Sequence, residues 1–200
     1  MTRQSTRPTE ADIAHVRRQL GRETHPFHRV VARCPWGAPA VVENLPYGRD
    51  GKPFPTLFWA TCPALVAAVG RVESGGGVKR FEAAVAGEPE LARSLAAATR
   101  YELRRRRALV ALYGLPMADS GASLATGIGG VAPGPARPSG APTLKCLHTH
   151  AAHALARPGY VLGERVLAEA APLYPSLACC TPAQRQEQRE QDADERRSER

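Results

Sequence analysis

Aromatic residues and long apolar runs are scarce in this chain of 200 residues. Phe, Trp and Tyr make up 6% of it, while 43% of all residues are hydrophobic, so Ala, Val and Leu must supply most of a core. The longest uncharged run, 53–70, contains three prolines and therefore does not fit a membrane-spanning helix. The first thirty residues are polar and charged and lack the apolar stretch of a secretory signal. We therefore expect a cytoplasmic protein that does not enter a membrane.

Disulfide frameworks and complete catalytic motifs are also missing from the sequence. Five cysteines occur, and without an export signal we expect them to be reduced thiols or metal ligands. Paired carboxylates and a Ser-His-Asp order, either of which would indicate hydrolysis, do not stand out. The sequence therefore leaves open whether the protein is an enzyme or a non-enzymatic binding or scaffold protein.

Positive charge is in excess but spread along the chain. The net charge is +8, which gives weak, salt-sensitive attraction to polyanions and does not indicate sequence-specific binding of nucleic acid. Four consecutive arginines, Arg104–Arg107, would wrap around a helix and could not all face one ligand. They fit a solvated face with ion pairs to Glu102 or to the charged tail, and the alternative is a surface for an acidic protein partner.

Hydrophobic periodicity and turn residues predict an α+β fold. A small β unit at 29–62 holds Val-rich strands at 29–34 and 39–44 and an aromatic strand at 56–62. Amphipathic or alanine-rich patterns predict helices at 11–21, 64–73, 78–85, 90–113, 145–156 and 164–173. Thr9 is expected to cap the first helix and Pro63 to open the second.

Composition divides the chain into one domain and flexible ends. We expect disorder at 1–10, a single α+β domain over 11–178 and a charged tail at 179–200. Within the domain, 131–142 is rich in Gly and Pro and is expected to be a flexible insertion.

The sharpest local feature is the run Lys145-Cys146-Leu147-His148-Thr149-His150. In a strand Cys146, His148 and His150 would share a face, whereas in a helix Cys146, His150 and His153 would. The alanine-rich continuation favours the helix. A cysteine in the first helical turn beside Lys145 has its thiolate stabilised by backbone N–H groups and by positive charge. Cys146 is therefore predicted to be a reactive thiol or a metal ligand.

Two further cysteines, Cys34 and Cys62, each precede a proline at the end of an expected strand. Together with Cys146, His148 and His150 they provide enough sulfur and imidazole ligands for a tetrahedral zinc site. Three interpretations stay open at this point: a metal site, a reactive thiol at Cys146, and cysteines that merely pack as small apolar residues.

A glycine-rich loop lies ahead of the same run. Gly127, Gly129 and Gly130, with Lys145, are candidates for a weak anion-binding site, because such loops can cradle phosphate. The loop lacks the complete phosphate-binding patterns, so a flexible connection is the alternative interpretation.

Four segments taken together resemble one bacterial family. They are RCPWGAP at 33–39, PFPTLFWATCP at 53–63, GIGG at 127–130 and KCLHTHA at 145–151. They are similar to the family catalogued as domain of unknown function five hundred and one, over roughly residues 13–175. The resemblance implies a cytoplasmic protein of unknown activity, often encoded beside a septum-formation initiator-like protein and an exopolyphosphatase-like enzyme. It thus points toward a partner in cell division or phosphate metabolism and identifies no catalytic residue.

Overall fold

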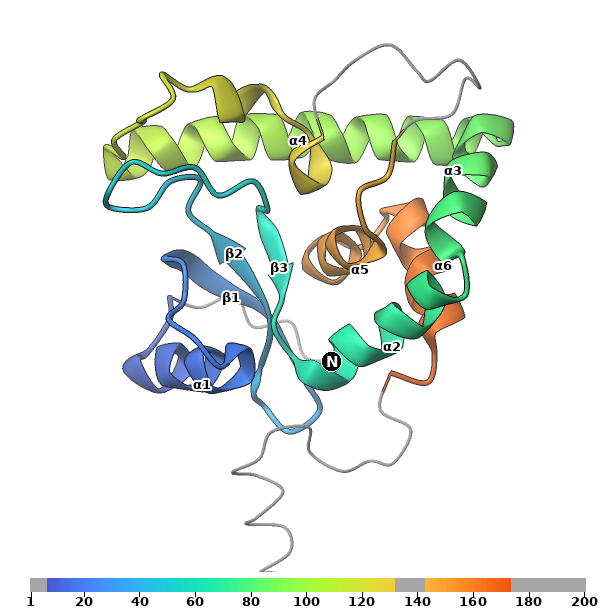
Figure 1. Ribbon diagram of the computed structural model, residues 1–200, viewed down its shortest axis with the longest axis horizontal. Coiled ribbons are helices and arrows are strands. Elements are labelled where there is room, and N and C mark those ends of the chain that lie inside the picture. The colour runs from blue at the N-terminus through green and yellow to red at the C-terminus, as the bar shows by residue number, and fades with distance from the viewer. Residues whose placement is uncertain (1–6, 132–142, 174–200) are drawn as a thin grey trace, which may run out of the picture.

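A computed structural model describes residues 7–131 and 143–173 and confirms the α+β class. Figure 1 shows a small sheet with helices on both sides of it. The sheet consists of β1 (Phe27–Arg33), β2 (Pro39–Asn44) and β3 (Phe58–Ala60). The α-helices of the described residues are α1 (Glu10–Leu20), α2 (Pro63–Ser74), α3 (Gly77–Gly87), α4 (Pro89–Tyr113), α5 (Leu147–Ala156) and α6 (Val161–Ala170).

The sheet is antiparallel, with the strand order β1-β2-β3, so β3 forms one edge. The hairpin between β1 and β2 closes with the Cys34 N–H donating to the Ala38 carbonyl at 2.9 Å, and Gly37 takes a positive φ of 80° there. After β3 the chain enters α2 directly, because Pro63 at its first position needs no hydrogen-bond partner for its nitrogen. The β unit expected at 29–62 is confirmed, but its first strand begins earlier, at Phe27, and its third covers only Phe58–Ala60.

Helix α1 begins directly after Thr9, the residue that the sequence predicted as its N-cap. Thr9 accepts from the Asp12 N–H, and the Asp12 carboxylate accepts from the Thr9 N–H, so the two residues form a capping box. This pair gives order to Thr9 and Glu10, which the sequence had assigned to a disordered segment. The described residues do not include 1–6 of that segment, 132–142 of the expected insertion, 174–178 of the expected domain or the expected tail at 179–200.

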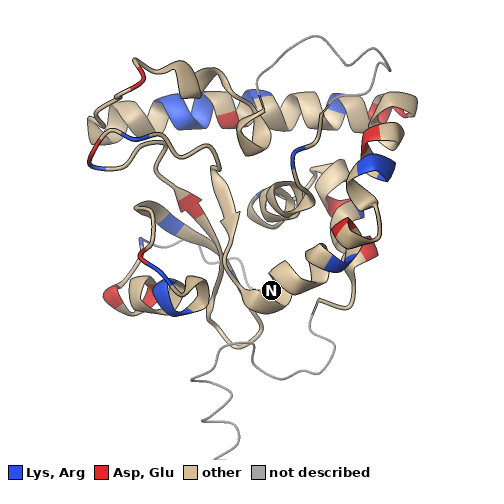
Figure 2. Cartoon of the chain, viewed as in Figure 1, with Lys and Arg blue, Asp and Glu red and all other residues tan. Residues whose placement is uncertain are grey.

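The arginines of α4 separate into different environments, as their wrapping around the helix requires. Arg105 forms an ion pair with the fully buried carboxylate of Glu43, with 2.6 Å between Arg105 Nε and Glu43 Oε1, and Arg29 completes the cluster. Arg106 is fully buried, while Arg104 and Arg107 are exposed. Figure 2 shows basic residues along α4. The ion partner is Glu43 of β2 rather than Glu102, and the acidic protein partner stays a prediction.

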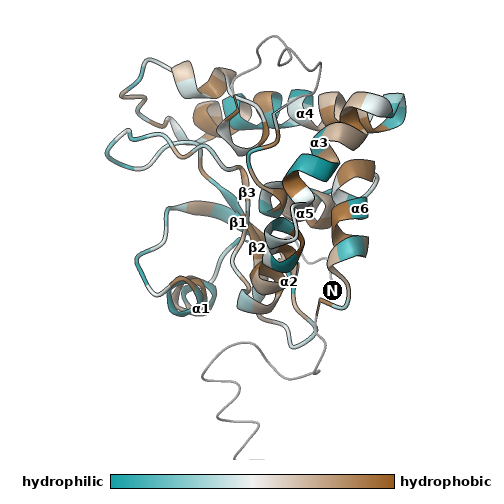
Figure 3. Ribbon diagram, turned by 45° about the vertical axis from the view of Figure 1, so that its right-hand side comes forward, coloured by the Kyte–Doolittle hydropathy of each residue, from teal (hydrophilic) through white to brown (hydrophobic). Residues whose placement is uncertain are grey.

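Two apolar cores hold the layers together. The smaller lies between α1 and one sheet face and includes Val16, Val30 and Val42. The larger lies between the other face and helices α2, α5 and α6, and apolar residues gather on these elements in Figure 3. Leu147 and Ala151 of α5 are fully buried in it, and this burial fixes the start of α5 beside β3. No helix of the described residues has the length and apolarity that crossing a membrane requires.

Candidate functional site

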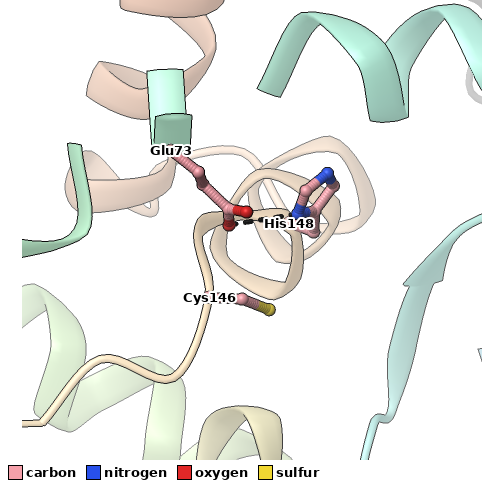
Figure 4. A group of neighbouring side chains, drawn as sticks. All are labelled: Glu73, Cys146 and His148. Atoms are coloured by element: carbon pink, nitrogen blue, oxygen red, sulfur yellow. Dashed lines mark hydrogen bonds and ion pairs between the residues drawn. The ribbon is translucent and has the colours of Figure 1, made fainter. Parts of the chain in front are cut away.

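The start of α5 brings Cys146 and His148 beside Glu73 at the end of α2 (Figure 4). Cys146 is the residue before the first helical turn and has extended backbone, with φ −156° and ψ 154°. The first N–H of the helix, that of Leu147, donates to Glu73 Oε1 at 2.5 Å. Glu73 therefore acts as the N-terminal cap of α5 from a different helix, which stabilises a carboxylate at this place.

Both ring nitrogens of His148 face hydrogen-bond acceptors. Nδ1 lies 3.1 Å from Glu73 Oε1, and Nε2 lies 3.0 Å from the Val66 carbonyl oxygen. A neutral imidazole carries one N–H, so both contacts are satisfied as donations only when the ring is doubly protonated. Hydrogen bonding to Cys146 raises the pKa of His148 to about 9, and the Val66 carbonyl and the Glu73 charge act in the same direction. His148 is therefore an imidazolium near neutral pH.

Cys146 is half-buried next to this cation. Its sulfur also lies 3.9 Å from the Thr149 hydroxyl oxygen. Burial raises the pKa of the Cys146 thiol, but hydrogen bonds from His148 and Thr149 outweigh it, so the pKa is lowered from its ordinary value. The Glu73 carboxylate opposes this shift by charge repulsion. On balance the pKa of Cys146 is lowered beside His148, whose Nδ1 contacts the Glu73 carboxylate.

The same three side chains form a compact set of possible metal ligands. One ligand atom from each of Glu73, Cys146 and His148 can be chosen so that all lie within 4.8 Å of one another. In the part of the chain that the structure describes, no other group of three such residues meets this condition.

A cavity of about 280 Å³ opens in front of the cysteine. Strand β3 and the residues before it contribute one side, and α2 and the start of α5 contribute the other. The lining residues are Thr56, Phe58, Trp59, Ala60, Val66, Cys146, His148 and Thr149. Since the walls are largely apolar, a small substrate would meet the thiol in a partly desolvated place.

The remaining ligands predicted from the sequence lie apart from this set. His150 is almost completely buried, and its Nδ1 is joined to the Tyr160 hydroxyl by a hydrogen bond of 2.7 Å. Burial lowers the pKa of His150 to about 3, with a smaller contribution from His153. Cys34 lies at the β1–β2 turn and Cys62 before α2, and both are fully buried. None of these three belongs to the group of ligand atoms within 4.8 Å.

The glycine loop packs against the start of α5. A Cβ atom built on Gly129, whose φ is 69°, would lie 3.4 Å from Thr149 Oγ1 and 3.5 Å from Lys145 Cβ. The candidate anion-binding residues Gly127, Gly129, Gly130 and Lys145 are thus near one another, and Lys145 is exposed. Anion binding by them stays a prediction.

Glu73 is the site residue that the sequence reasoning missed. It was assigned only to the end of a helix before Gly75. It lies 73 positions before Cys146 in the chain, and no local spacing connects the two. A carboxylate at the end of a helix, where the helix dipole disfavours it, was the one available signal that Glu73 has a partner elsewhere.

Comparison with known proteins gives one match. A family model described as "Protein of unknown function (DUF501)" matches residues 30–168, which is more than half of the chain and includes the three site residues. No curated protein and no solved structure matches the chain. The match confirms the resemblance found in the sequence and adds no activity to it.

Proposed function

The chain belongs to the DUF501 family, a family of unknown function, and we propose that Cys146 is a reactive thiolate that forms a covalent bond with a small acyl substrate. The observation that carries this proposal is the position of His148, whose two ring nitrogens both face acceptors beside the sulfur. A cysteine next to an imidazolium at a helix start is the arrangement that makes a thiol nucleophilic near neutral pH.

Each residue of the site has a separate role in this proposal. The Cys146 sulfur attacks the carbonyl carbon, the bond to the leaving group breaks, and the leaving group replaces the Val66 carbonyl as partner of His148 Nε2 and takes its proton. Water then attacks the resulting thioester, gives one proton back to His148 and releases an acid, while Cys146 returns to a thiolate. Glu73 is a positioning residue, because it orients His148 through Nδ1 and does not line the cavity.

The test is the rate at which iodoacetamide alkylates each cysteine, mapped by mass spectrometry over a range of pH. We expect Cys146 to react while buried Cys34 and Cys62 of the same molecule are protected and act as internal controls. We expect His148→Gln to slow alkylation of Cys146 at pH 7 by about tenfold or more, because the thiol loses its cationic partner.

The conservative control is Thr143→Ser, at an exposed residue outside the site, which should leave the rate unchanged. The proposal is wrong if Cys146 in the native protein reacts no faster than in the urea-unfolded chain and if His148→Gln does not change its rate.

A zinc site at Glu73, Cys146 and His148 is the second candidate, and it is favoured because the three ligand atoms all lie within 4.8 Å of one another. Three protein ligands leave a fourth position open, as in catalytic zinc sites. Zinc would have to displace a proton and the Glu73 contact from His148 Nδ1, which counts against it. Titration with zinc against a competing chelator tests it: one equivalent bound with protection of Cys146 from alkylation supports it, and no binding in the micromolar range excludes it.

A further inference from the structure

Helix α4 presents one face to solvent over most of its length, and positive charge dominates this face (Figure 2). Its exposed arginines are Arg93, Arg100, Arg104 and Arg107, which we call the arginine stripe. The other exposed residues between 92 and 113 are uncharged: Ala92, Ala96, Ala97, Ala108, Ala111, Leu112 and Tyr113. Glu102, the acidic residue of this stretch, is 2% exposed and contacts His153 in the core. The face therefore carries positive charge without a carboxylate of its own.

The spacing of the arginine stripe places its members on one side of the helix. Successive members are seven, four and three positions apart, and the stripe extends over about 21 Å at a rise of 1.5 Å per residue. The alanines between them are too short to cover the guanidinium groups. The four side chains form no hydrogen bond or ion pair with a residue of 7–131 or 143–173, whereas those of Arg105 and Arg106 do. Their charges are therefore available to a partner.

We infer that the arginine stripe binds an acidic α-helix of a partner protein, a helix that carries Glu or Asp at intervals of three and four residues. Intervals of three and four residues are those at which the contacting residues of two helices repeat when the helices lie side by side. A guanidinium group forms two parallel hydrogen bonds with one carboxylate, so each arginine of the stripe can hold one acidic residue. The net charge of +8 adds attraction at longer range.

Apolar side chains at the end of the stripe favour a protein helix over other anionic partners. Of the four exposed large hydrophobic residues in the described chain, three lie within six positions there: Leu112, Tyr113 and Met117, at 65%, 44% and 42% exposure. Nucleic-acid phosphates would match the arginines but offer nothing apolar to these side chains. A helix that enters a lipid surface turns large apolar residues outward along its length, where α4 has alanine and arginine. An amphipathic acidic helix matches both the stripe and its apolar end.

The experiment measures binding of a labelled synthetic peptide to the full-length protein by fluorescence anisotropy. The probe is a helical peptide of about 28 residues with Glu on one face at intervals of three and four and a Leu at the end of that face. The reference peptide has the same composition with its Glu residues distributed around the helix. We expect the first peptide to bind at least about tenfold more tightly. Equal binding overturns the inference, because net charge alone would then explain the attraction.

Protein variants test the stripe itself. The double variant Arg100→Gln, Arg107→Gln should weaken binding of the first peptide at least about tenfold. The matched control is Arg7→Gln, Arg71→Gln, which lowers the net charge equally at two exposed arginines outside α4 and should bind within about threefold of the parent. Leu112→Ser should weaken binding about threefold through the apolar end. Thermal unfolding checks that the variants fold, and equal losses in the two double variants overturn the inference.

Three other occupants of the stripe are outcomes of the same test, and each overturns the inference. Tighter stripe-dependent binding of a DNA duplex, or of phosphatidylcholine vesicles containing phosphatidylglycerol, assigns the stripe to nucleic acid or to a lipid surface. The third occupant is the C-terminal segment, in which Glu187, Glu190 and Asp194 have the same spacing. If their joint substitution by Gln strengthens peptide binding tenfold, this segment covers the stripe. None of these results depends on Cys146, so the proposed function stands or falls separately.

Discussion

The first turn of α5 and the turns that follow it hold their histidines in opposite ways. His148 has 24% of its side chain exposed, faces a carboxylate and a carbonyl, and has its pKa raised to about 9. His150 has 2% exposed, and burial lowers its pKa to about 3. His153 is equally buried, with Nδ1 2.9 Å from Glu102 Oε1. Two positions along one helix thus change an imidazole from a cation at a cavity to a neutral group inside the core.

The difference shows that the partner and the solvent, not the residue type, decide what a histidine does. The cluster of His148, Cys146 and Glu73 borders a cavity and can exchange protons with a ligand there. His150 and His153 are instead held by Tyr160 and by Glu102 among apolar and aromatic neighbours. We therefore expect changes at the first group to alter reactivity, and changes at the second to alter stability.

The largest expected effect is on the buried pair. His153→Leu leaves the Glu102 carboxylate, 2% exposed, without its hydrogen-bond donor, and its Oε2 atom has no partner among the described residues even now. Removing one member of a buried polar pair costs about 3 kcal/mol, so we expect the free energy of unfolding in urea to fall by that amount.

The matched control for this prediction removes both members. In the double variant Glu102→Leu, His153→Leu the unpaired carboxylate is gone, but the fully buried Arg106 also loses the negative charge of Glu102, so we expect only part of the lost stability to return. A double variant less stable than His153→Leu would show that the charge of Glu102 matters more to Arg106 than to His153.

The second-largest expected effect concerns the close contact between Gly163 of α6 and helix α5. A Cβ atom at Gly163 of α6 would lie 2.3 Å from the His150 carbonyl oxygen and 2.8 Å from Ala154 Cβ. Gly163→Ala must therefore push the two helices apart, and we expect a loss of about 2 kcal/mol in the free energy of unfolding. Gly70→Ala in α2, where nothing lies within 4 Å, should be neutral or stabilising. A neutral Gly163→Ala would mean that α6 is free to shift.

The fold was largely predictable because its elements follow local rules. The Thr9 cap, Pro63 at the start of α2 and the valine-rich strands act within a few residues, and each was placed from the sequence. Leu109 and Leu112 are three positions apart in α4, so periodicity places them on one side of the helix, yet Leu109 is fully buried and Leu112 is 65% exposed. Such boundaries depend on neighbouring elements that periodicity does not include.

The site was predictable only in part, for the same reason. Cys146 and His148 stood out because they are two positions apart, and the helix that carries them was expected. Glu73 reaches them only through the packing of α2 on α5, a contact between distant parts of the chain. The orientation of His150 toward Tyr160 of α6 likewise follows from tertiary packing, so spacing alone could not separate it from His148.

The third prediction tests the neutral state of His150. Because its pKa in the folded protein is about 3 and lies below that of the unfolded chain, the unfolded state binds a proton first as the pH falls. Stability is therefore lost from about pH 6.5 downward, with a slope of up to about 1.4 kcal/mol per pH unit. His150→Gln should remove this slope between pH 6.5 and 4.5. The measurement is the free energy of unfolding in urea of the parent and of the variant, each plotted against pH. Parallel curves would place a proton on His150 in the folded state.

The smallest expected effect on stability comes from His148, and an NMR titration of its imidazole ring measures the pKa concerned. A raised pKa stabilises the fold below the pKa of the unfolded chain and loses this contribution as the pH rises through about 9, while the lowered pKa of Cys146 adds stability over the same range. The two contributions have opposite signs over this range and therefore offset each other in part.

We therefore expect the pair to change stability less with pH between about 6.5 and 9 than His148 alone would, in contrast to the acid slope of His150. In Cys146→Ala the first cause of the raised pKa is gone, and the His148 titration should move down from about 9 while that of His150 does not change. A His148 pKa that stays at about 9 without the sulfur would assign the charge to Glu73 and the Val66 carbonyl alone. The thiol would then be a neighbour of the cation rather than the group that gave up the proton.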